Sequence, residues 1–123
     1  MFTKGNILMN IERFEGTGRM SKAVRFGNML YLCGQTDTTA ADVQGQTKAV
    51  LAKIEDLLNK YGSDKDHILT ATIYVKTMND FAAMNEIWDA WVNNGHEPAR
   101  ACVQAEMARP EILVEIVVAA AVK

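Results

Sequence analysis

Apolar residues recur along this chain with two spacings, and the change from one to the other divides it into strands and helices. Loose alternation over residues 7–14 predicts a first strand. Apolar and aromatic runs at 23–26 and 29–33 follow, separated only by Gly27 and Asn28. Two turn residues between such runs predict two strands joined in a tight hairpin.

Helical spacing then takes over in two segments. The first has N-cap candidates at 36–39 and ends before Gly62, which we expect to adopt a positive φ just beyond the helix. Its apolar positions, together with one threonine, are Val43, Thr47, Val50, Leu51, Ile54, Leu57, Leu58 and Tyr61. The second segment is predicted to start at a cap on Asn79 and to stop at Gly95. Its apolar face comprises Phe81, Met84, Ile87, Trp88, Trp91 and Val92.

Residues 68–75 are rich in β-branched side chains and predict a strand, and two more strands are expected at about 99–107 and 112–122. The order is strand-strand-strand-helix-strand-helix-strand-strand, in one domain spanning 1–123. Both helices are amphipathic, so we expect an α+β fold with both helices on one face of a mixed sheet. The last strand is apolar on both faces, and a second copy of the chain is the simplest cover for the face without helices.

Composition narrows the function classes. The chain has 123 residues, 49% hydrophobic and 23% charged, with a net charge of −2. Its basic residues are scattered, so we expect no nucleic-acid partner. The longest apolar run, 116–122, is too short to span a bilayer, and the first residues lack the apolar core of a signal peptide. We therefore expect a cytoplasmic protein without a membrane partner, in which Cys33 and Cys102 are free thiols.

The apolar runs 98–103 and 113–117, at the start of the last two predicted strands, each carry one charged residue, Arg100 and Glu115. A charge in such a setting is costly unless it is paired or used. If the two strands lie side by side, these residues form a small polar pocket. Arginine suits a carboxylate, which accepts two parallel hydrogen bonds, and a glutamate can orient or deprotonate a water. This predicts hydrolysis of a small carboxylate; the alternative is a structural ion pair between the strands.

These features resemble the RidA (YjgF/UK114) family of reactive intermediate deaminases. The resemblance covers nearly the whole chain and is most specific in PARACV at 98–103, followed by VEI at 114–116. CGQ at 33–35 and NDFAAMN at 79–85 also fit. The resemblance implies a chorismate-mutase-like fold and a homotrimer with ligand clefts between subunits. It implies hydrolysis of 2-imino acids to 2-keto acids and ammonia, without cofactor or metal.

The resemblance also implies roles for individual residues. Arg100 would bind the substrate carboxylate and Glu115 would position the attacking water. Gly34 would allow close backbone approach, and Asn85 would line the opposite wall. The implied substrate-binding residues are Cys33, Gly34, Asn85, Arg100 and Cys102. Cys102 would act mainly through its backbone, and Cys33 is either core or cleft wall.

One position departs from the family pattern. Deaminase members usually carry a tyrosine in a turn that here reads GRMS at 18–21, so Met20 replaces a hydroxyl with a thioether. Arg19 beside it adds a charge that can enter the cleft or point to solvent. This departure keeps a second function open, a binding protein that holds a keto acid or similar carboxylate without turning it over.

Other residues have simpler interpretations. No histidine is close in sequence to Cys102, so an inert buried thiol is expected there rather than a nucleophile. His67 and His96 fall in or beside polar loops, and no Cys/His spacing predicts a metal site. Residues 16–18 (GTG) are expected to form a loop rather than a phosphate cradle, because no strand-loop-helix pattern surrounds them.

Overall fold

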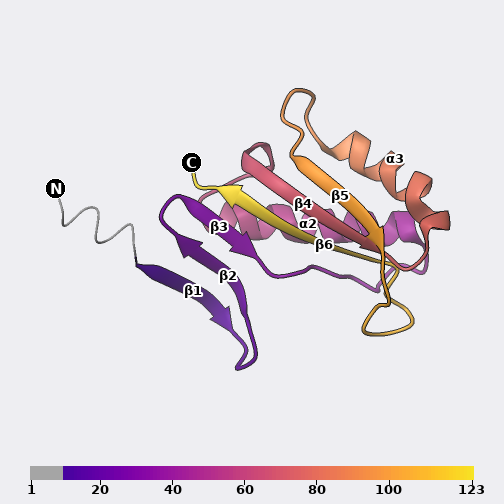
Figure 1. Ribbon diagram of the computed structural model, residues 1–123, viewed down its shortest axis with the longest axis horizontal. Coiled ribbons are helices and arrows are strands. Elements are labelled where there is room, and N and C mark those ends of the chain that lie inside the picture. The colour runs from indigo at the N-terminus through magenta and orange to yellow at the C-terminus, as the bar shows by residue number, and fades with distance from the viewer. Residues whose placement is uncertain (1–9) are drawn as a thin grey trace.

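The computed structural model describes residues 10–123. Its elements follow the expected order: β1 (Ile11–Gly16), β2 (Ser21–Phe26), β3 (Met29–Leu32), α2 (Val43–Lys60), β4 (Ile68–Val75), α3 (Phe81–Trp91), β5 (Ala99–Gln104) and β6 (Val114–Ala121). Short 3-10 turns at Lys65–His67 and Met78–Asp80 precede β4 and α3. Figure 1 shows one continuous sheet running from the β1–β2 hairpin to β5. The predicted α+β fold is confirmed.

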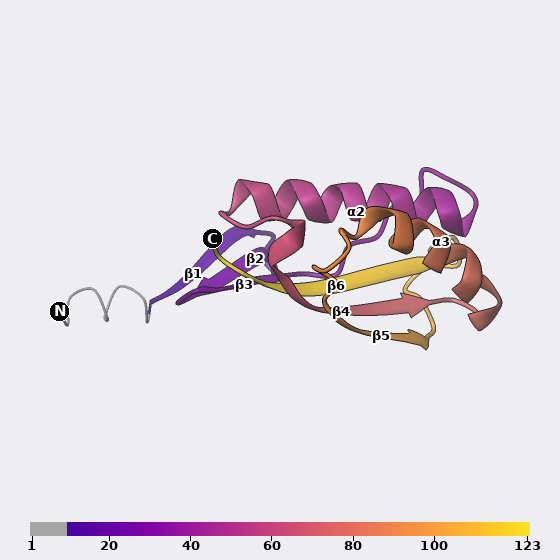
Figure 2. The same cartoon turned by 90° about the horizontal axis from the view of Figure 1, so that it is seen from above.

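The six strands lie in the order β1-β2-β3-β6-β4-β5. Only β4 and β5 are parallel, and every other neighbouring pair is antiparallel, so the sheet is mixed as predicted. The last strand of the chain, β6, is inserted between β3 and β4 and joins the hairpin half of the sheet to the other half. Both helices lie on the same face, α2 along β6 and α3 near the β4–β5 end (Figure 2).

The core lies between the helices and this face of the sheet. In β6 the buried residues alternate, and the residues between them are half-buried. The fully buried side chains include Leu30, Leu51, Ile54, Leu58, Ile73, Met84 and Ile116. The opposite face, here called the open face, carries no helix. Its apolar side chains include Tyr31 and Val103, which are 46% and 45% exposed. The alternation predicted for the last strand is therefore confirmed.

The hairpin and the end of the first helix also match their predictions. Gly27 has a φ of +60° in the two-residue turn between β2 and β3. Gly62 has a φ of +91° just beyond α2, and the Ser63 N–H donates to the Leu58 carbonyl at 2.8 Å. This six-to-one hydrogen bond closes the helix in the Schellman arrangement.

The helix starts differ from their predictions. The α2 cap is Asp42, whose Oδ1 accepts from the Gly45 N–H at 2.8 Å, and not a residue of 36–39. Thr39 belongs instead to the preceding turn, where its N–H and hydroxyl both donate to Asp37. The predicted cap Asn79 is wrong as well. Thr77 caps the 3-10 turn that runs into α3 by accepting from the Asn79 N–H.

Several predicted ends shift by a few residues. Helix α3 stops at Trp91, and Gly95 lies in the loop beyond it with a φ of +88°. Strand β1 begins at Ile11; the first predicted residues, 7–9, lie outside the described part. Strand β6 begins at Val114 because the Leu113 N–H donates to the side chain of Gln46 on α2 instead of to a strand. Strand β5 ends at Gln104, where the chain turns into the loop before β6.

Candidate functional site

Arg100 lies on β5, at the edge of the sheet, and its side chain meets α3. Its Nη1 donates a hydrogen bond to Asn85 Oδ1 at 2.7 Å. The guanidinium carbon lies 5.4 Å from the ring centroid of Trp88. Asn85 and Trp88 are three residues apart on α3 and so occupy the same side of the helix. One contact fixes an edge of the guanidinium and the other supports its plane, while its other N–H groups have no partner among residues 10–123.

Trp88 therefore does more than the sequence indicated. We expected it only on the apolar face packed against the sheet, and at 5% exposure it is indeed part of the core. Its indole also faces the Arg100 guanidinium, a cation–π contact that favours the charged group in a defined place. The sequence signal for this role was the i, i+3 spacing between Asn85 and Trp88. This spacing becomes informative only once Arg100 is known to face α3.

Cys102 shares the Arg100 side of β5, because side chains two residues apart on a strand point the same way. It is half-buried and packs against the core. Burial raises the pKa of the Cys102 thiol, although the nearby Arg100 charge acts in the opposite direction. The thiol is therefore protonated at neutral pH and is a poor nucleophile. This geometry supports the expected inert role.

Glu115 lies on the open face and belongs to a second group of residues. Its carboxylate is so close to Gly34 that a Cβ at position 34 would overlap Glu115 Oε2. The next residue, Gln35, is bridged to Ile116, with its N–H donating to the Ile116 carbonyl at 2.9 Å. Gln35 also donates through its side chain to Cys33 Sγ at 3.2 Å. The segment 33–35 is thus fixed against β6, and only glycine leaves room for the carboxylate.

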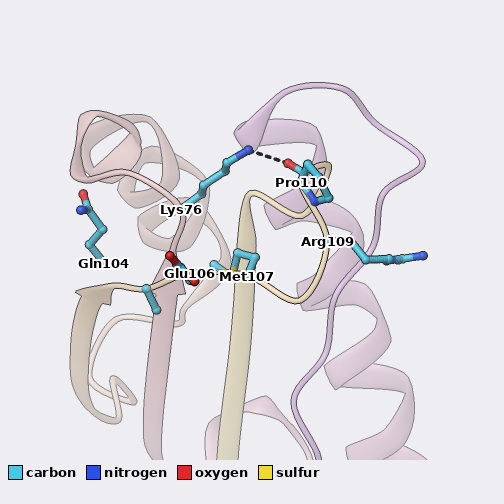
Figure 3. Close-up of a pocket in the computed structure, with 7 residues that line it drawn as sticks. Lys76, Gln104, Glu106, Met107, Arg109 and Pro110 are labelled. Atoms are coloured by element: carbon cyan, nitrogen blue, oxygen red, sulfur yellow. Dashed lines mark hydrogen bonds between the residues drawn. The ribbon is translucent and has the colours of Figure 1, made fainter.

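A pocket of about 360 Å³ opens beside Glu115. It is lined by Tyr74, Ala105, Glu106, Met107, Glu115 and Val117. A larger pocket of about 470 Å³ lies beyond the carboxyl ends of β4 and β5 and shares Ala105, Glu106 and Met107 with it. Figure 3 shows that the Lys76 ammonium there is directed at the Pro110 carbonyl, to which it donates at 2.6 Å. None of the predicted site residues lines the larger pocket.

Arg100 and Glu115 are not neighbours, which corrects the sequence interpretation. Strand β4 separates their strands, with Ala71 paired to Arg100 and Tyr74 paired to Glu115. Positions 71 and 74 point to opposite faces, because side chains alternate along a strand. Arg100 thus faces the helices and Glu115 the open face, so neither a shared pocket nor an ion pair between these two residues exists within one chain.

Met20 lies in the β1–β2 turn and is 50% exposed. The Thr17 N–H donates to the Met20 carbonyl at 2.8 Å, so residues 16–18 belong to a hairpin loop, as expected. At the end of β2 that adjoins this turn, the Cys33 N–H donates to the Lys22 carbonyl at 3.0 Å. This bond continues the β2–β3 ladder toward Ser21 and Gly34, so the turn lies at the same end of these strands as the Glu115 group.

Residues 10–123 contain no group of three or more His, Cys, Asp or Glu side chains placed to hold a metal ion. His67 is half-buried and pairs with Asp64, with 2.6 Å between Nδ1 and Oδ1. Within the same described range, no helix has the length and apolar character needed to cross a membrane.

Comparison with known proteins places the chain. The family model described as Endoribonuclease L-PSP matches residues 10–122. The RutC family protein YoaB of Escherichia coli K12 is 46% identical over 93% of this chain and all of its own length. A RutC family protein of Haemophilus influenzae is 41% identical over 91% of this chain and 98% of its own.

Solved structures agree with this placement. The crystal structure of NMB1025, a YjgF family protein of Neisseria meningitidis, superposes with a TM-score of 0.92 at 45% identity, covering 94% of this chain and 97% of that one. These matches extend over the whole sheet and both helices rather than a single motif. The chain therefore belongs to the RidA (YjgF/UK114) family, to which the Endoribonuclease L-PSP family model corresponds.

Proposed function

We propose that this protein hydrolyses 2-imino acids to 2-keto acids and ammonia. The observation that carries the proposal is the Arg100 guanidinium, which Asn85 and Trp88 hold in place while its remaining N–H groups have no partner in the described range 10–123. A planar fork in a fixed orientation suits a carboxylate better than a flexible ammonium does. The family resemblance implies the same role for Arg100.

The substrate site is assembled from two subunits in this proposal. Arg100 and Glu115 lie on opposite faces of the sheet, so a small imino acid held by Arg100 cannot reach Glu115 of the same chain. The apolar open face provides the surface on which further copies pack, in a homotrimer. Arg100, Asn85 and Cys102 of one subunit then face Gly34 and Glu115 of the next across a cleft.

The chemistry needs few groups. The iminium carbon is already electrophilic, so water adds to it once the carboxylate is anchored. Glu115 accepts a proton from the attacking water as the carbon–oxygen bond forms, giving a carbinolamine. Glu115 then passes that proton to the nitrogen and accepts the hydroxyl proton as the carbon–nitrogen bond breaks, so that the carbonyl of the keto acid forms and ammonia leaves. Atoms and electrons balance without any redox step.

Met20 supports a second possibility, a protein that binds keto acids without turning them over. The thioether cannot donate a proton where deaminase members usually carry a tyrosine hydroxyl. In contrast, the sequence gives little support to the endoribonuclease activity in the description of the family model. A net charge of −2 and scattered basic residues provide no stripe for an RNA backbone.

The decisive experiment measures ammonia and keto-acid release from freshly generated 2-iminopropanoate and 2-iminobutanoate. We expect acceleration over the spontaneous reaction, loss of it in Arg100→Ala, and a slower reaction in Glu115→Gln that still binds keto acid. Met20→Tyr should raise the rate, because one general acid–base group contributes about 10²–10⁴-fold. No acceleration by the wild type or by Met20→Tyr would reject the enzyme and leave the binding protein.

Light scattering tests the assembly in parallel. The proposed homotrimer predicts about three times the 13.6 kDa mass of one chain. A stable monomer would rule out the composite site, because Arg100 and Glu115 would then have no common cleft.

A further inference from the structure

The β1–β2 hairpin carries a pocket that holds Met20 together with two arginines to which the proposed reaction gives no role. Its volume is about 460 Å³, and it is lined by Arg13, Gly18, Arg19, Met20, Ser21 and Val24. Arg13 pairs with Val24 in the sheet, and Val24 pairs with Tyr31, so Arg13 belongs to the open face. Two guanidinium groups thus line one pocket, together with a hydroxyl and a methionine.

No acidic side chain lines this pocket, because the acids of the hairpin are directed elsewhere. Glu12 lies 3.9 Å from Arg25. Glu15 accepts from Lys60 at 3.0 Å and from the Tyr61 hydroxyl, both at the end of α2. Glu15 has a φ of +54°, an uncommon conformation for a non-glycine residue.

Arg13 and Arg19 consequently form no ion pair among residues 10–123. The sequence of residues 1–9 contains no Asp or Glu that could be the acidic partner of either arginine. Two cations on one pocket repel each other, and an anion between them removes that repulsion. Guanidinium groups are well suited to carboxylates, which they bind with paired hydrogen bonds. The pocket therefore has the charge and the donors of an anion site.

The position of this pocket connects it to the proposed reaction. The Gly18–Ser21 turn lies at the same end of β2 and β3 as Gly34, against which Glu115 is packed. A substrate with its imine carbon near Glu115 can direct its side chain along Gly34 toward the turn. We propose that Arg13 and Arg19 bind a second acidic group on the substrate, so that 2-imino dicarboxylates are preferred over imino acids with apolar side chains. This deepens the proposed function and rests on it for the placement of the imine carbon.

The test compares two keto acids, which are the reaction products. Calorimetry at low salt should show 2-oxoglutarate binding about tenfold or more tightly than 2-oxobutanoate, because charge-assisted hydrogen bonds to a second carboxylate are added. In Arg13→Gln/Arg19→Gln the ratio of the two affinities should fall to about one. Raising the salt concentration should shrink the wild-type ratio, since the pocket is exposed.

Arg25→Gln is the matched control. It removes one charge from the same hairpin, as Arg19→Gln does, but Arg25 lies beside Glu12 and lines neither the hairpin pocket nor the pocket beside Glu115, so the ratio should be that of the wild type. The single variant Arg19→Gln, in an exposed turn, guards against misfolding of the double variant and should lower the ratio by itself. Equal wild-type affinities, or a preference that survives loss of both arginines, would overturn the proposal.

The same measurements separate this inference from the proposed function. Hydrolysis of 2-iminobutanoate without any preference for 2-oxoglutarate would retain the deaminase and reject the second anion site. An arginine-dependent preference for 2-oxoglutarate without acceleration of any imine would reject the deaminase and retain the site as part of a dicarboxylate-binding protein.

Discussion

Arg100 Nη1 and Asn85 Oδ1 are joined by a hydrogen bond of 2.7 Å, which ties the edge strand β5 to α3. An amide oxygen satisfies one guanidinium N–H without neutralising the positive charge. A carboxylate in the same place would satisfy the same donor and cancel the charge as well. The choice of amide over acid at position 85 is therefore what leaves Arg100 available to an anionic ligand.

Asn85→Asp should weaken binding of 2-oxobutanoate more than Asn85→Ala does, although aspartate is nearly isosteric with asparagine. The new carboxylate competes for the guanidinium, whereas alanine only removes an orienting bond. A charged hydrogen bond contributes about 1.5–3 kcal/mol, so we expect at least about a tenfold loss in calorimetry. Asn94→Asp adds the same charge in the exposed loop after α3 and should leave the affinity unchanged. An equal loss of affinity in Asn85→Asp and Asn94→Asp would indicate that the added charge acts in general and not through Arg100.

The helices and strands could be predicted from the sequence because each of them buries side chains mainly on one face. Helix α2 was recognisable because its buried positions recur every three or four residues, and β6 because they alternate. The helix starts were missed because several polar side chains suited to capping lie close together before each helix, and the sequence pattern does not show which of them accepts from the helix N–H groups. Asp37 accepts from Thr39 in the preceding turn, whereas Asp42 caps α2.

The relation between Arg100 and Glu115 could not be read from the pattern. Alternation along a strand shows which residues share a face of that strand, but not which strand lies beside it. Here β4 lies between β6 and β5 and separates the two charges, and its registers with these strands place Arg100 and Glu115 on opposite faces. The contact of Gly34 with Glu115 likewise depends on the bridge between Gln35 and Ile116, which joins distant parts of the sequence.

Gly34→Ala should slow imine hydrolysis while preserving the fold. The added methyl group would overlap the end of the Glu115 side chain, which is flexible and can move away. The carboxylate would then no longer be placed for the attacking water, and kcat should fall more than keto-acid affinity. Gly16→Ala is the matched control, since a Cβ added at position 16 would lie 4.0 Å from the Met20 carbonyl oxygen, which leaves room for it. Wild-type kcat in Gly34→Ala would show that the position of Glu115 is unimportant.

Cys102 should behave as a structural thiol. Burial raises its pKa, so little thiolate exists at neutral pH and alkylation by iodoacetamide at pH 7.5 should be slower than for a free cysteine peptide. Peptide mapping by mass spectrometry distinguishes it from Cys33. Cys102→Ser should retain imine hydrolysis within a fewfold change. Complete loss of activity in a folded Cys102→Ser variant would instead assign the sulfur a chemical role.

Asp37 should make stability depend on pH in the acid range. Hydrogen bonds from Thr39 and the Lys53 ammonium, 3.0 Å from the carboxylate, lower the pKa of Asp37 from 3.8 to about 2. A carboxyl group with a lowered pKa stabilises the fold above its unfolded-state pKa, and this contribution is lost as pH falls from about 4 to 2. Asp37→Asn should therefore lower Tm at pH 7 and flatten the decline of Tm over that acid window.

Asp56→Asn provides the comparison for this effect. Asp56 is exposed on α2 and forms no hydrogen bond or ion pair through its side chain among residues 10–123, so the variant removes the same charge without a partner. Its Tm at pH 7 should stay close to that of the wild type, and its acid decline should keep the wild-type slope. If both variants flatten the decline equally, net charge and not the contacts of Asp37 governs acid stability. If only Asp37→Asn does so, the loop between Gly34 and α2 is held by this carboxylate.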